Sequence, residues 1–260
     1  MTCSRRRIPH LFEHWDSVAK SIRASKRVAL FLDFDGTLVN IASRPDRVRL
    51  GAGARRVLVN LARHRRVRLA VISGRRRVEL QHYIGIRKIE YLGLYGWERD
   101  GYVKLSSPAQ LALFRAQANL LVELAAYPGV WIEPKSDSFS IHLLGTTAGV
   151  QRHVRRRVKT LVEPLAETLH VFENLRDLEV VPVSIKDKGS AVREILEKAV
   201  FRAALPIYFG DDLSDEPAFT AVRKGISILV GKRRATRAQF YLRGPAEVAV
   251  ALSMMEAILK

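Results

Sequence analysis

Residues 28–37 read VALFLDFDGT, and this stretch decides the fold of the chain. The unbroken apolar run at its start is typical of a strand buried on both faces, as strands of parallel α/β sheets are. Asp33 and Asp35 follow at the end of that strand, and Gly36 permits an abrupt turn after them. Ligands of parallel α/β sheets collect beyond the carboxyl ends of the strands, so the stretch also predicts where the chemistry takes place.

Working outward, the same pattern recurs on both sides of a central region with a different texture. Residues 67–72 form a second apolar run that ends at Ser73-Gly74-Arg75, and we expect a third strand around Tyr91. Strands that alternate with helical patterns predict a doubly wound parallel sheet, and therefore an α/β fold. After Pro182 the pattern predicts helices at 189–199, 215–222 and 246–259, and strands at 205–209 and 226–230.

The central region predicts a separate α+β layer. Its order is α-β-β-α-β-β, which does not continue a parallel sheet. We therefore expect a core formed by residues 1–104 and 184–260, interrupted by an inserted domain of residues 105–183. The expected elements are helices at 109–126 and 147–168, the latter bent or ended by Pro164, and strands at 130–133, 139–144, 170–173 and 178–183.

Composition excludes several classes of protein. The chain has 260 residues, of which 48% are hydrophobic and 27% charged, as in globular rather than disordered proteins. No apolar run is long enough to cross a bilayer, and the basic start lacks the apolar stretch of a signal peptide. Cys3 is the single cysteine, which excludes an intrachain disulfide and a multi-cysteine metal site. We expect a cytoplasmic protein with no membrane partner.

The formal net charge of +18 has two readings. A nucleic-acid-binding protein has such a charge in bulk. However, the arginine runs are scattered along the chain, without interleaved aromatic residues, zinc spacings or a known binding motif. We therefore favour a solvated arginine-rich surface, whose field attracts anionic substrates, and expect no specific nucleic-acid partner.

Three predicted strand ends carry clusters suited to phosphoryl chemistry: Asp33 to Thr37, Ser73 to Arg75, and Gly210 to Glu216. Buried carboxylates are costly unless a cation or ligand neutralises them, and oxygen ligands without His or Cys favour Mg²⁺. One carboxylate can attack phosphorus, while a second protonates the leaving alcohol and later activates water. Each cluster alone is also compatible with a helix cap, a turn or a loop. Their joint order, completed by Lys188, makes coincidence improbable.

The motifs DFDGTL, SGR, KDKG and GDDLSDE resemble those of the haloacid-dehalogenase (HAD) superfamily of phosphohydrolases. The resemblance implies a HAD-like fold with Mg²⁺ as cofactor. It makes Asp33 the nucleophile, Asp35 the general acid and base, and Lys188 the catalytic residue that neutralises nucleophile and phosphate. The implied phosphate-binding residues are Ser73, Gly74 and Lys188, and the implied metal ligands are Asp33, Asp35, Asp211 and Asp212, with Asp215 in support.

The resemblance narrows to the trehalose-6-phosphate phosphatase family through longer motifs, among them ISGRRRVELQHYIG, GLYGWERDG, YPGVWIEPK and GDDLSDEPAF. They run from about Val28 to the last helix, and the inserted domain is similar to the cap domain of that family. Two residues apart on a strand, Glu133 and Lys135 point to the same face and can together bind sugar hydroxyls and a phosphate, although a routine surface ion pair is the alternative. The resemblance implies substrate contacts by Glu133, Lys135, Glu179, Arg75 and, on weaker grounds, Arg176.

Departures from the family pattern fall mainly in the predicted cap. Tyr95, Leu144 and Val181 stand where the family often has basic residues. We therefore expect a monomeric Mg²⁺-dependent phosphatase that hydrolyses trehalose 6-phosphate, a small-molecule sugar phosphate, through an aspartyl-phosphate intermediate. The alternatives are a phosphatase for another glycoside phosphate, such as glucosylglycerol or sucrose phosphate, and a basic nucleic-acid-binding protein with a phosphatase-like fold.

Overall fold

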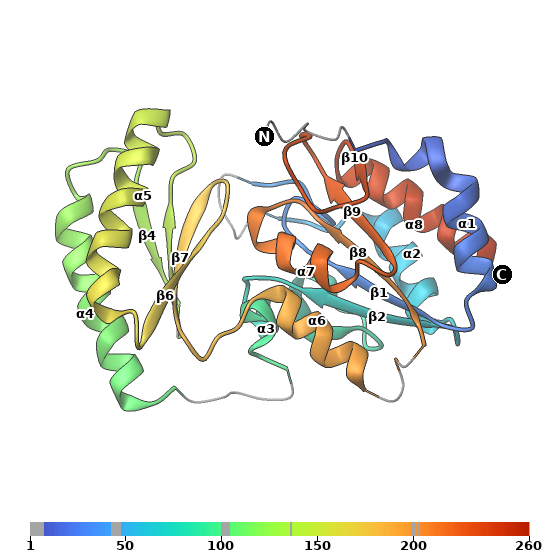
Figure 1. Ribbon diagram of the computed structural model, residues 1–260, viewed down its shortest axis with the longest axis horizontal. Helices are drawn as coiled ribbons and strands as arrows, with labels where there is room; N and C mark the ends of the chain where they lie inside the picture. The colour runs from blue at the N-terminus through green and yellow to red at the C-terminus, as the bar shows by residue number, and fades with distance from the viewer. Residues whose placement is uncertain are drawn as a thin grey trace, which may run out of the picture. The chain divides into compact units, whose positions relative to one another are not determined.

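The computed structural model describes residues 8–42, 48–99, 105–135, 137–198, 201 and 203–259. The chain divides into two compact units (Figure 1). We call residues 1–101 together with 186–260 the core unit, and residues 102–185 the inserted unit. The predicted catalytic motifs all belong to the core unit, and the predicted sugar-binding residues of the middle region belong to the inserted unit.

A six-stranded sheet forms the centre of the core unit, and all of its strand pairs are parallel. The strand order is β10-β9-β8-β1-β2-β3. From β1 the chain first proceeds to one side and later returns to the other, so the order reverses at β1 and β8, where such sheets form a ligand crevice. The strands are β1 (Val28–Leu32), β2 (Val67–Ile72), β3 (Glu90–Leu92), β8 (Leu205–Gly210), β9 (Ile226–Val230) and β10 (Phe240–Leu242).

Helices cover both faces of this sheet, which explains why its strands are apolar throughout. Leu30 and Leu32 of β1 enter one buried apolar cluster, and Ala29 and Phe31 enter another on the opposite face. The first cluster includes residues of α1 (Trp15–Ala24), α2 (Ala52–Arg63), α3 (Arg77–Ile84) and α8 (Pro245–Leu259), and the second includes residues of α6 (Lys188–Glu197) and α7 (Glu216–Ala221) (Figure 1). Among the described residues, no helix is long and apolar enough to cross a bilayer.

The inserted unit is an antiparallel sheet with two helices on one face (Figure 1). Phe139, Ile141, Leu178 and Val180 alternate along its strands and are fully buried, while residues between them form the second face. The strand order is β4-β5-β7-β6. Its elements are α4 (Ser107–Leu124), β4 (Trp131–Pro134), β5 (Phe139–His142), α5 (Ala148–Val162), a 3₁₀ turn (Glu163–Leu165), β6 (Leu169–Glu173) and β7 (Asp177–Pro182).

Candidate active site

A buried ion cluster lies at the carboxyl ends of β1 and β8. Asp33 directly follows β1, and Lys188 is the first residue of α6. The Lys188 ammonium donates to Oδ1 of Asp33 and to Oδ1 of Asp215, both at 2.7 Å. None of these residues is more than 4% exposed, so their charges are screened little by water. The sheet therefore brings together residues that are 155 positions apart in the chain.

Asp215 organises the loop that follows β8. Besides the Lys188 bond, its Oδ1 accepts a hydrogen bond from the Tyr208 hydroxyl at 2.7 Å. Its Oδ2 accepts from the backbone N–H groups of Asp211 and Asp212, at 3.0 and 2.9 Å. A Cβ at Gly210 would lie 2.4 Å from the Asp215 Cγ, so only glycine permits this approach. Tyr208 was not among the predicted site residues, because nothing distinguishes it within an apolar strand.

Burial sets the protonation of this cluster. It raises the pKa of Asp33 to about 7, even though the charge of Lys188 acts in the opposite direction. Burial also lowers the pKa of Lys188, but the charges and hydrogen bonds of Asp215 and Asp33 outweigh it and raise that pKa above its ordinary value. Lys188 is thus a permanent cation. A further positive charge near Asp33 would favour the ionised form of its carboxyl.

Three of the buried carboxylates fit a metal ion. Asp33, Asp211 and Asp215 each offer an oxygen, and these oxygens lie within 4.8 Å of one another. Together with the Lys188 ammonium they carry a formal net charge of −2, which one divalent cation balances. Gly36 has a φ of +81°, and a Cβ there would lie 2.1 Å from Oδ2 of Asp211, so this glycine makes room for the carboxylate.

Two of the predicted metal ligands lie outside this group. The Asp212 carboxylate accepts a hydrogen bond from the backbone N–H of Leu213 at 2.6 Å. Asp35 forms a two-pronged ion pair with Arg75, whose Nε and Nη2 lie 2.6 and 2.8 Å from its oxygens. Burial lowers the pKa of Arg75, but the hydrogen bonds and charge of Asp35 outweigh it and raise that pKa. The predicted general acid and base, Asp35, is thus paired with a predicted substrate-binding residue, Arg75.

The motif Ser73-Gly74-Arg75 is held by a strained loop. Ser73 is buried, and its hydroxyl accepts a hydrogen bond from the Arg75 N–H at 3.2 Å. Leu94 and Tyr95, in the loop after β3, have φ angles of 44° and 61°, a region that residues other than glycine rarely adopt. The Tyr95 N–H donates to the Ser73 carbonyl at 2.9 Å, and a Cβ at Gly74 would lie 3.0 Å from the Tyr95 hydroxyl. Tyr95, one of the departures noted above, therefore packs directly against Gly74.

In the inserted unit, Lys135 forms an ion pair with Glu179, whereas the sequence predicted that its ammonium lies beside Glu133 to bind substrate. Its ammonium lies 2.9 Å from both oxygens of Glu179, which is only 2% exposed. The hydroxyls of Ser138 and Ser140 also donate to these oxygens. The difference arises because Lys135 lies beyond the end of β4, where its N–H bonds to the Ser138 carbonyl. Burial lowers the pKa of Lys135, but Glu179 outweighs it and raises that pKa.

The remaining predicted residues of the inserted unit are more open. Glu133 on β4 bonds to His142 on β5, with its Oε2 2.8 Å from the imidazole Nε2. Arg176 is half-buried between β6 and β7. Two of the three departures from the family pattern lie in this unit: Leu144 is exposed, and Val181 is fully buried on β7.

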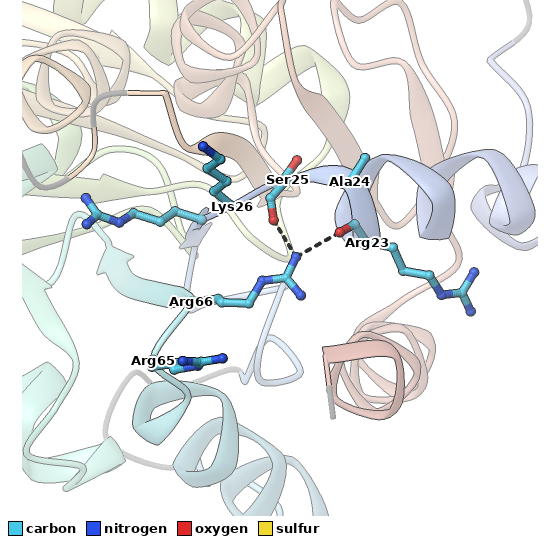
Figure 2. A pocket seen from close by; sticks show the side chains of 7 residues that line it. Arg23, Ala24, Ser25, Lys26, Arg65 and Arg66 are labelled. Atoms are coloured by element: carbon cyan, nitrogen blue, oxygen red, sulfur yellow. Dashed lines mark hydrogen bonds between the residues drawn. The ribbon is translucent and has the colours of Figure 1, made fainter.

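A second concentration of charge lies at the opposite edge of the core sheet, where β1 and β2 begin. A pocket of about 420 Å³ is lined by Arg23, Ala24, Ser25, Lys26, Arg27, Arg65 and Arg66, none of which is acidic (Figure 2). Arg66 donates through Nη2 to the carbonyls of Ile22 and Arg23, at 2.9 and 3.1 Å, and to that of Ser25. These are carbonyls at the end of α1, so Arg66 has a structural role as a helix C-terminal cap.

Comparison with known proteins links this geometry to a family. A family model described as Trehalose-phosphatase matches residues 31–246. The trehalose-phosphate phosphatase of Mycolicibacterium paratuberculosis is 34% identical over 243 residues, which make up 87% of this chain and 61% of that protein. The chain thus spans about three fifths of the length of this curated relative.

Solved structures show the same fold at lower sequence identity. The C-terminal domain of the C. albicans trehalose-6-phosphate phosphatase has a TM-score of 0.82 at 19% identity, covering 96% of this chain and 98% of that one. A haloacid dehalogenase-like hydrolase from Bacteroides thetaiotaomicron has a TM-score of 0.60 at 18% identity, covering 88% of this chain and all of that one. The predicted HAD-like α/β fold is confirmed.

Proposed function

Because this chain belongs to the trehalose-phosphatase family, we propose that it hydrolyses trehalose 6-phosphate to trehalose and phosphate. The observation that carries the proposal is the buried cluster of Asp33, Lys188, Asp211 and Asp215 at the point where the strand order reverses. It combines a carboxylate that can attack phosphorus with a cation that stabilises the phosphoryl charge.

In the first step, an oxygen of Asp33 attacks phosphorus in line with the sugar oxygen. The new bond joins Asp33 to the phosphoryl group, and the bond between phosphorus and the sugar oxygen breaks. Lys188, already hydrogen-bonded to Asp33, remains beside the phosphoryl oxygens throughout. Ser73 and Gly74 complete the phosphate-binding site in this proposal.

Asp35 supplies the proton that the leaving sugar oxygen needs, and then removes a proton from the water that attacks the aspartyl-phosphate. As this water bonds to phosphorus, the bond between phosphorus and the Asp33 oxygen breaks, which releases phosphate and restores the Asp33 carboxylate. The ion pair with Arg75 must open for this, because a carboxylate held by two guanidinium hydrogen bonds is ionised. A phosphorylated substrate offers Arg75 an alternative anion. Substrate binding thus releases Asp35 for its role as acid and base.

We propose Mg²⁺ as the cofactor, held by Asp33 and Asp211. Each of these carboxylates offers an oxygen to the group described above, and both oxygens of Asp215 accept hydrogen bonds from Lys188, Tyr208 and two backbone N–H groups. When bound, the ion supplies positive charge that stabilises the phosphoryl oxygens of the transition state. Asp35 and Asp212 stay candidate ligands whose side chains must reorient to reach it.

Metal binding is expected to raise the thermal stability of the enzyme. Saturating Mg²⁺ relieves repulsion among the buried carboxylates, and an ion at a hundred times its dissociation constant stabilises the fold by about 2.7 kcal/mol, a shift of several degrees. Differential scanning fluorimetry after EDTA treatment, with and without added Mg²⁺, measures it. Asp211→Asn should abolish the shift, while Asp16→Asn, the same change at an exposed position, should not. An unaltered melting curve in unmodified protein would contradict the assignment.

Within the inserted unit, we propose that residues 105–183 form a cap domain that binds the sugar. Glu133, Lys135, Glu179 and Arg176 are the proposed contacts, with Arg75 in the core unit. Glu179 and Lys135 act as one buried pair in this proposal, because each neutralises the other. We also propose that the protein is a cytoplasmic monomer, for which the single cysteine Cys3 and the like charge of all copies are the supporting facts.

Phosphate release across a panel of esters tests the substrate. We expect kcat/KM for trehalose 6-phosphate to exceed that for sucrose 6-phosphate, glucosylglycerol phosphate and glucose 6-phosphate by about tenfold or more, because a pocket that hydrogen-bonds sugar hydroxyls rejects analogues that leave its groups unpaired. A preference for another glycoside phosphate would transfer the proposal to that sugar and point to Tyr95, Leu144 and Val181 as the cause. Hydrolysis of none of these esters would refute it.

A further inference from the structure

The second face of the inserted sheet carries an aromatic pair that the proposed mechanism does not use. Trp131 on β4 lies directly opposite His142 on β5 in the strand register. Their rings are stacked, with centroids 3.9 Å apart and planes inclined by 15°. This contact gives the indole a defined orientation on the sheet.

His142 is itself held in place. Its Nε2 lies 2.8 Å from Oε2 of Glu133, two residues after Trp131. Residues two apart on a strand point to the same face, so Trp131 and Glu133 are neighbours on one face of β4. The three side chains form a unit in which a carboxylate lies beside an oriented aromatic ring.

Trp131 stays 44% exposed despite this support. His142 covers one face of the indole, so the exposed part is the other face together with the ring edges. A large aromatic side chain, fixed in orientation yet uncovered, offers a binding surface. The C–H groups on one side of a pyranose ring carry partial positive charge and match the negative face of an indole. Hydroxyls at the sugar edge match a carboxylate such as Glu133.

The same face also bears the buried pair of Lys135 and Glu179. Glu133 is paired with Ser140 across β4 and β5, and Ser140 with Glu179 across β5 and β7. Trp131 and His142 form the neighbouring row on this face, so a sugar stacked on Trp131 lies beside the row of residues proposed to bind its hydroxyls. Aromatic surface and polar groups together are what a carbohydrate site requires.

We propose that Trp131, supported by His142, is a substrate-binding residue that stacks on a glucose ring of trehalose 6-phosphate. The inference rests on the proposed function and deepens it. It assigns to Trp131 and Glu133 the preference for a disaccharide ester over a phosphate ester without a sugar ring.

Kinetics of Trp131→Ala and Trp131→Phe test the stacking. Acetyl phosphate is the comparison substrate, because it presents a phosphoryl group without a ring. We expect Trp131→Ala to lower the ratio of kcat/KM for trehalose 6-phosphate to that for acetyl phosphate about tenfold, mainly through KM, and Trp131→Phe to retain part of it. Phe114→Ala removes another exposed aromatic side chain, on α4, and should leave the ratio unchanged.

Fluorescence gives a second readout that needs no turnover. Titration with trehalose should change the tryptophan emission of the unmodified protein, and Trp131→Phe should remove this change while Trp15 and Trp97 remain. Equal losses on both substrates in Trp131→Ala, or an emission that trehalose does not alter, would overturn the inference. A preference for trehalose 6-phosphate that survives Trp131→Ala overturns it too, yet leaves the proposed function standing. If the unmodified protein hydrolyses none of the esters in the panel above, the proposed function itself is refuted.

Discussion

Replacing Asp33 by asparagine is expected to leave a folded protein that releases almost no phosphate. The amide cannot form the acyl-phosphate, and loss of a nucleophile that works as part of a unit reduces kcat by about 10⁴-fold or more. Single-turnover assays with trehalose 6-phosphate measure the loss. Substantial turnover by a well-folded Asp33→Asn protein would exclude the covalent mechanism.

The same substitution should stabilise the metal-free protein, and increasingly so as pH rises. The pKa of Asp33 in the folded state is about 7, above its ordinary value of 3.8, because burial disfavours the charged form. A carboxyl that binds its proton more tightly in the folded state makes ionisation destabilising, and this cost grows between about pH 4 and pH 7. Asparagine removes the cost. Urea denaturation in EDTA should therefore show a larger advantage of Asp33→Asn at pH 8 than at pH 4.

Lys188→Met is expected to damage both activity and stability. Lys188 is the shared donor to two buried carboxylates, so its removal leaves their charges uncompensated, which costs about 3–5 kcal/mol. Urea denaturation in EDTA measures this loss, and added Mg²⁺ should recover part of it. Phosphate release should fall steeply as well, because the transition state loses a fixed positive charge.

Lys186→Met is the matched control for this prediction. Lys186 is two residues earlier, 69% exposed, and 3.5 Å from Glu194. An exposed ion pair of this kind contributes about 0–1 kcal/mol, so its loss should be small. Similar destabilisation by the two substitutions would show that the buried cluster does not depend on Lys188.

The parts of the site that sequence could predict are those fixed by strand ends. Val28 to Leu32 had to be a strand buried on both faces, and neighbouring parallel strands end at one edge, so Asp33 and Asp211 had to meet. Predicting which side chains pair also requires the register between strands, which the sequence does not give. Lys135 reaches Glu179 across β5, and Asp35 bonds to Arg75 from another strand end, neither of which follows from spacing along the chain.

The strand β10 and the helix α1 of the core were not predicted, for different reasons. β10 has only three residues, too few for an alternating pattern, and it follows a basic stretch. α1 buries Val18, Ala19 and Ile22, whose spacing is helical, so its signal was present in the sequence. Asp35 and Asp212 illustrate a further limit, because a motif names candidate ligands without revealing which other groups compete for their oxygens.

The position of β1 between β2 and β8 has a consequence for synthesis of the chain. As the ribosome proceeds from the amino end, β2 follows β1 closely, but β8 starts only at residue 205. Until then one edge of VALFL exposes unpaired N–H and C=O groups on an apolar strand, which is a template for aggregation. The nascent chain therefore carries this unpaired edge during most of its translation, and the buried cluster of Asp33, Lys188 and Asp215 can form only after β8 has been made.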